Sequence, residues 1–138
     1  MTKKKVIDLA TIDTVKGSNE GFDVRIYHPG TNEDLDITIS VLGKDSDAFQ
    51  KISRAQNKKR LAKMQKGGFR TTAAPLEEIE SDGIDLLASC TTGWAGINVN
   101  GKEIEFSKDN ALMIYEGYPW IREQVDTAIG DRANFIKA

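Results

Sequence analysis

The sequence predicts an α+β fold, in which a β-hairpin-rich N-terminal part precedes a mainly helical part with one small β-hairpin. Apolar residues alternate with polar ones before residue 43 and recur at helical spacing after it. Capping and turn-forming residues separate these stretches. We therefore divide the 138-residue chain into a β-rich part (residues 1–43), a basic helix with a flexible joint (44–70) and a helical C-terminal part with a hairpin near 97–106 (71–138).

Two strands are expected in the N-terminal part. Residues 22–27 and 35–41 alternate between apolar and polar side chains, which places one row on a core and the other in water. The turn-forming residues between them predict a hairpin. His28 lies in this connection, and we interpret it as a turn residue. The apolar residues of the stretch 6–16 are expected to add an edge strand.

A basic helix is expected next. Asp45 or Ser46 supplies the side-chain oxygen that caps a helix, and the pair Gly67-Gly68 ends it. Residues 44–70 carry a net charge of +7, against −2 for residues 1–43 and −7 for residues 71–138. Such segregation of charge along the chain affects which partners a protein binds more than it affects the fold. Residues 67–74 are predicted to form the flexible joint.

The C-terminal part is expected to hold three helices and a hairpin. Pro75 fits the first turn of a leucine-rich helix that ends near residues 91–93, and a break at residues 81–83 is left open. Asn100-Gly101 is a favoured hairpin turn. Ser107 caps a helix that stops at Gly117, and Pro119 opens the last helix. Residues 131–138 are expected to form a tail.

Composition argues against several classes of protein. One cysteine, Cys90, and one histidine exclude an internal disulfide framework, a cysteine-rich zinc site and a histidine cluster. No glycine-rich phosphate-binding motif follows a strand, and apolar runs are too short for a membrane span or a signal peptide. We expect no enzyme activity, no cofactor and no metal. Cys90 is interpreted as a small buried hydrophobe, and the acidic residues near 77–85 as partners of a helix dipole.

The basic helix is the candidate partner-binding element. Seven of its side chains are the candidate contacts: Lys51, Arg54, Lys58, Lys59, Arg60, Lys63 and Lys66. Two interpretations stay open, a charged grip on a partner and an ordinary solvated face. Four residues are predicted to be structural anchors near helix ends: Trp94, Tyr118, Pro119 and Trp120.

The second half of the chain carries a distinctive order of residues. A leucine-rich helix leads to Thr92-Gly93-Trp94, and a Gly101-Lys102 hairpin leads to Asn110-Ala111, then to Tyr118-Pro119-Trp120, with Phe135 near the end. This order, over residues 75–138, resembles the tail assembly chaperones of long-tailed bacteriophages.

The resemblance implies a non-catalytic role in virion morphogenesis in the host bacterial cytoplasm. Proteins of this kind bind the tape measure protein, keep that long helical chain soluble, promote tail-tube assembly around it and are absent from the mature virion. Contact with the tail tube protein and self-association are further expectations, the latter through the opposite charges of residues 44–70 and 71–138. Two alternatives remain: a minor virion structural protein for head–tail joining or tail completion, and a nucleic-acid-binding protein that uses the basic helix 51–66.

Overall fold

The computed structural model describes residues 6–66 and 76–136 and confirms the α+β fold. Its main elements follow in chain order: α1 (Thr14–Glu20), β1 (Phe22–Tyr27), β2 (Asp34–Val41), α2 (Asp47–Lys66), α3 (Leu76–Cys90), β3 (Thr91–Ala95), β4 (Asn98–Val99), β5 (Lys102–Glu103), α4 (Lys108–Gly117) and α5 (Pro119–Gly130). Two short 3-10 helices, η1 (Leu9–Ile12) and η3 (Arg132–Phe135), lie near the two ends of the described chain.

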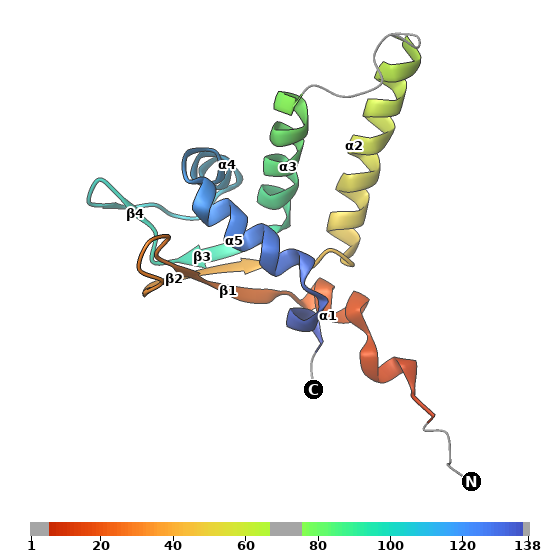
Figure 1. Ribbon diagram of the computed structural model, residues 1–138, viewed down its shortest axis with the longest axis horizontal. Helices are drawn as coiled ribbons and strands as arrows, with labels where there is room; N and C mark the ends of the chain where they lie inside the picture. The colour runs from red at the N-terminus through yellow and green to blue at the C-terminus, as the bar shows by residue number, and fades with distance from the viewer. Residues whose placement is uncertain (1–5, 67–75, 137–138) are drawn as a thin grey trace.

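A three-stranded antiparallel sheet in the order β1-β2-β3 forms the base of the molecule. Helices α3, α4 and α5 lie over one face of it (Figure 1). Val24, Ile26 and Ile39 are buried against these helices, whereas Asp23 and Arg25 point to the opposite, solvent-exposed face. The predicted hairpin of β1 and β2 is thus confirmed, with its alternation dividing core from water.

The third strand is a feature that the sequence did not reveal. Strand β3 follows α3 directly and pairs with β2, with Ile39 opposite Trp94. Helix α3 is continuous through Gly83, so there is no break at residues 81–83. The C-terminal part therefore supplies a strand to the sheet of the N-terminal part, and buried residues from both parts form one hydrophobic core.

The expected edge strand at residues 6–16 is wrong. The stretch forms η1 and the start of α1, because two aspartates cap these elements. The Asp8 carboxylate accepts a hydrogen bond from the Ala10 amide at 3.0 Å, and Asp13 accepts one from the Lys16 amide at 2.9 Å. Short acidic side chains that bond to nearby amides favour helix starts over strands.

The remaining C-terminal turns and caps agree with the sequence. Asn100 and Gly101 both have positive φ, 52° and 78°, in the turn that joins β4 to β5. The Ser107 hydroxyl accepts a hydrogen bond from the Asn110 amide at 3.0 Å at the start of α4. Pro119 opens α5, where a missing amide hydrogen costs nothing.

The segment after α5 is part of the core. Phe135 is buried at 1 % exposure and packs edge-to-face on Phe22, with ring centroids 5.9 Å apart. Helix α1 lies against η3 so closely that a Cβ on Gly17 would stand 1.5 Å from the Phe135 carbonyl oxygen. This end of the chain therefore ties α1 to the sheet.

The basic helix forms where the sequence places it. Ser46 is buried at the start of α2, and its hydroxyl accepts a hydrogen bond from the Phe49 amide at 3.2 Å. The expected glycine stop at 67–68, the flexible joint at 67–74 and the role of Pro75 lie outside the described residues.

Candidate partner-binding site

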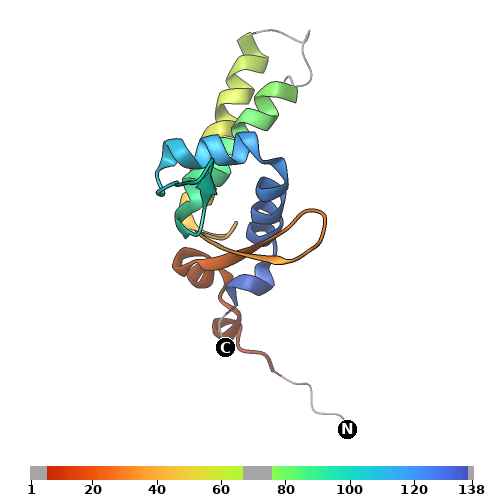
Figure 2. The same cartoon turned by 90° about the vertical axis from the view of Figure 1, so that its left-hand side faces the viewer.

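Helices α2 and α3 lie side by side and rise together from the sheet (Figures 1 and 2). Helix α3 is anchored by buried Ile84, Leu87 and Cys90. No residue of α2 is fully buried, although Phe49 packs against the core near the base of the helix. The distal half of α2 is therefore held mainly by its contacts with α3.

Polar contacts join the two helices. The Gln56 side-chain amide donates to the Asp82 carbonyl at 2.8 Å, and the Arg60 guanidinium pairs with the Asp82 carboxylate at 3.0 Å. Lys63 pairs with Glu78 at 2.9 Å. Two of the seven candidate contacts, Arg60 and Lys63, thus form ion pairs that hold α2 against α3. The acidic residues at the start of α3 pair with α2 and also interact favourably with the dipole of their own helix.

Five basic side chains stay exposed on the outer face of α2. They form no ion pair within residues 6–66 and 76–136, and we call them the basic face: Lys51, Arg54, Lys58, Lys59 and Lys66. Lys51, Arg54 and Lys58 are three or four residues apart and share one side of the helix, and Lys59 and Lys66, seven residues apart, lie at the margin of that side. This face is a concentrated positive charge that no carboxylate in the described part of the chain pairs with.

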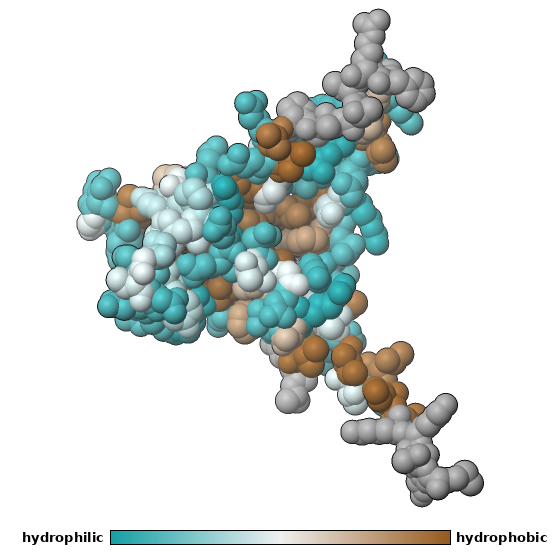
Figure 3. Space-filling view, in the orientation of Figure 1, coloured by the Kyte–Doolittle hydropathy of each residue, from teal (hydrophilic) through white to brown (hydrophobic). Residues whose placement is uncertain are grey.

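Exposed apolar side chains lie at the far ends of the same two helices. Leu61 and Met64 of α2 are 60 % and 40 % exposed, and Leu76 and Ile79 of α3 are 84 % and 46 % exposed. We call these four the distal apolar residues, and Figure 3 shows hydrophobic surface at this end of the molecule. The Lys63–Glu78 ion pair brings the two stretches together.

The predicted anchor residues lie at the other side of the molecule. The Trp94 indole donates to the Ile104 carbonyl at 2.8 Å and packs edge-to-face on Phe106, at 5.2 Å between centroids. Tyr118 and Trp120, on either side of Pro119, are also half-buried and stack edge-to-face at 6.5 Å. These rings fill the junctions between β3, the small hairpin and the last two helices.

The side chains with potentially reactive groups are either buried or already hydrogen-bonded within the protein. Burial raises the pKa of the Cys90 thiol to about 11, so the thiol is neutral near pH 7. Burial also raises the pKa of Tyr115 to about 12, and its hydroxyl shares a 2.7 Å hydrogen bond with Thr91. His28 Nδ1 accepts from the Gly30 and Thr31 amides in the turn, both at 3.0 Å. Among the described residues, no three His, Cys, Asp or Glu side chains are grouped as metal ligands.

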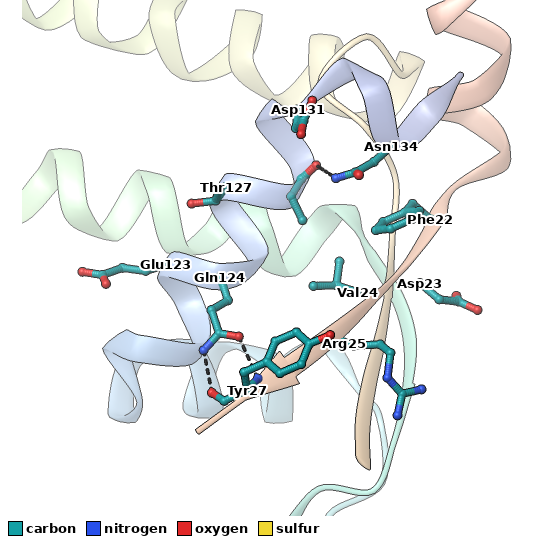
Figure 4. A pocket seen from close by; sticks show the side chains of 11 residues that line it. Phe22, Asp23, Val24, Arg25, Tyr27, Glu123, Gln124, Thr127, Asp131 and Asn134 are labelled. Atoms are coloured by element: carbon teal, nitrogen blue, oxygen red, sulfur yellow. Dashed lines mark hydrogen bonds between the residues drawn. The ribbon is translucent and has the colours of Figure 1, made fainter. Parts of the chain in front are cut away.

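A second feature, a groove of about 680 Å³, lies between β1 and α5 (Figure 4). Phe22, Val24 and Ala128 give it an apolar floor, and Glu123 and Asp131 give it an acidic margin on the α5 side.

The groove ends at a side-chain bridge between α5 and β1. The Gln124 side-chain oxygen accepts from the Tyr27 amide, and its nitrogen donates to the Tyr27 carbonyl, both at 2.8 Å. The groove has no sequence signature, because its residues come from elements about 100 positions apart.

Comparison with protein family models, with curated proteins and with solved structures gives no significant match to this chain. None of the described helices is long and apolar enough to cross a bilayer.

Proposed function

We propose that this protein is a non-enzymatic bacteriophage tail assembly chaperone that binds the tape measure protein through α2 and α3. In this role it keeps the tape measure protein soluble in the host bacterial cytoplasm, promotes tail-tube assembly around it and is absent from the mature virion. The observation that supports the proposal is the projecting helix pair, which combines five exposed basic side chains with four exposed apolar ones.

The chemistry of this pair suits a helical client. An amphipathic helix can lay its apolar stripe on the distal apolar residues, which removes hydrophobic surface of both partners from water. Carboxylates beside that stripe can then meet Lys58 and Lys59. Charge complementarity of this kind sets orientation and association rate more than affinity. The preferred client segment is therefore an amphipathic helix with acidic flanks.

Nucleic acid binding is the second candidate, because five exposed cations on one helix also suit a phosphate backbone. The sequence places no aromatic residue between Phe49 and Phe69 that would stack on a base. This mode would be sequence-independent and would weaken steeply with salt. A minor virion structural protein is the third candidate.

The first experiment is co-expression with the tape measure protein of the same genome, with soluble client as the measurement. The test variant is Lys58→Glu/Lys59→Glu, which reverses the basic face and leaves Arg60 with its partner Asp82. A variant that also reversed Arg60 would place two carboxylates together between the helices and confuse unfolding with lost binding.

The matched control is Lys16→Glu/Lys102→Glu, which makes the same change of charge at exposed positions outside α2. We expect soluble client with the wild type and the control, and a several-fold loss with the test variant. An insoluble client in every case contradicts the chaperone role. Salt-sensitive binding to duplex DNA, or the protein in purified virions, then assigns it to the second or third candidate.

A further inference from the structure

The segment before α1, together with the first two residues of that helix, exposes much apolar surface. Val6, Ile7 and Leu9 are 93 %, 62 % and 79 % exposed, and Ile12 and Val15 are 47 % and 50 % exposed. We call residues 6–15 the N-terminal arm. Figures 1 and 3 show it as a hydrophobic projection that leaves the body beyond α1. Within residues 6–66 and 76–136 these side chains stay largely uncovered, and apolar surface of this kind marks an interaction site.

The groove between β1 and α5 complements the arm in shape and charge. Its apolar floor can receive aliphatic side chains, and Glu123 and Asp131 give its margin on the α5 side a negative charge. The arm is flanked in the sequence by Lys3, Lys4 and Lys5 before it and by Lys16 after it. Opposite charges at the ends of an apolar contact fix its direction.

The geometry of the chain points to a second copy as the occupant. Helix α1 separates the arm from β1, and the groove begins at Phe22, just after that helix. The arm points away from the sheet and therefore away from the groove of its own chain (Figure 1). A neighbouring copy meets no such restriction.

We propose that the N-terminal arm of one copy docks in the β1–α5 groove of the next copy. Each copy then gives one arm and receives one, so the contact is head-to-tail and builds an open chain or a closed ring. The arm and the groove are different from the oppositely charged segments, residues 44–70 and 71–138, from which the sequence predicts self-association. They also leave the basic face of α2 free.

Two variants separate the halves of the contact. The arm variant is Val6→Asp/Leu9→Asp, and the groove variant is Glu123→Lys/Thr127→Arg. All four side chains are exposed, so the substitutions leave the core intact. Lys102→Glu on the small hairpin is the control. Circular dichroism and thermal unfolding verify that each variant is folded.

Sedimentation velocity of the purified chain, without any client, provides the measurement. We expect the wild type and the control to form species larger than a monomer as concentration rises. Each variant alone should associate at least about tenfold more weakly. An equimolar mixture should form a dimer and nothing larger, because it contains one intact arm and one intact groove per pair.

Three results would overturn the proposal: a wild type that stays monomeric at the highest soluble concentration, an arm variant that associates as the wild type does, and a mixture that remains monomeric. Because no client is present, these results are independent of the tape measure experiment.

Discussion

Phe135→Ala is the most direct test of how this fold is held together. The ring is 1 % exposed, lies edge-to-face on Phe22 and belongs to η3, which contacts α1. Truncation of a buried phenylalanine to alanine costs about 3–5 kcal/mol, and the lost aromatic pair is part of that cost. Because domains are stable by about 5–15 kcal/mol, this loss removes a large share of the free energy of unfolding.

Urea unfolding followed by tryptophan fluorescence measures the effect, with Trp94 and Trp120 as reporters. The adjacent Ile136→Ala is the matched control, because Ile136 is 44 % exposed, and we expect it to cost less than about 1 kcal/mol. The thermal midpoint of Phe135→Ala should fall by about 10–15 °C. If the two variants lose equal, small amounts of stability, the end of the chain is not part of the core.

Three further predictions concern pH and the backbone. The Arg132 guanidinium holds the pKa of Asp45 at about 2. Because that pKa is depressed in the folded state, the ionised Asp45 carboxylate stabilises the fold above about pH 4, and this stabilisation is lost as the pH falls towards 2. Asp45→Asn should therefore make the free energy of unfolding, measured by denaturation at a series of pH values, depend less on pH in the acid range. The pKa of Cys90 is raised to about 11, so stability should fall above pH 9, and a thiol reagent should label Cys90 only as the protein unfolds. Gly101→Ala, at φ 78°, should cost about 1 kcal/mol in a urea titration and leave the secondary structure seen by circular dichroism unchanged.

Local chemistry explains which parts of the fold were predictable. Alternation along residues 22–27, the Asn100-Gly101 turn and the caps at Ser46 and Ser107 each act over a few residues, so the sequence shows them directly. Strand β3 has no such signature. Its sequence, Thr-Thr-Gly-Trp-Ala, does not alternate clearly, and it is a strand because β2 offers a free edge beside the end of α3.

The candidate partner-binding site also has one part that the sequence predicts and one part that only the structure shows. The basic composition of α2 is visible in the sequence, but the register between α2 and α3 is a tertiary property. Only the structure shows that Arg60 and Lys63 are paired with Asp82 and Glu78. Lys58 and Lys59 form no ion pair with another residue that the structure describes. The sequence likewise predicts only a tail around Phe135, because one aromatic residue in a short segment does not show that its ring reaches Phe22.

Gln124 has a consequence for how the sheet can grow. Strand β1 is an edge strand, and a row of unpaired backbone groups on such an edge is a template for fibril formation. At its last residue the Gln124 amide occupies both backbone groups of Tyr27, as a neighbouring strand would. A strand added by another molecule therefore stops short of Tyr27, and this one side chain limits cross-β polymerisation along the β1 edge.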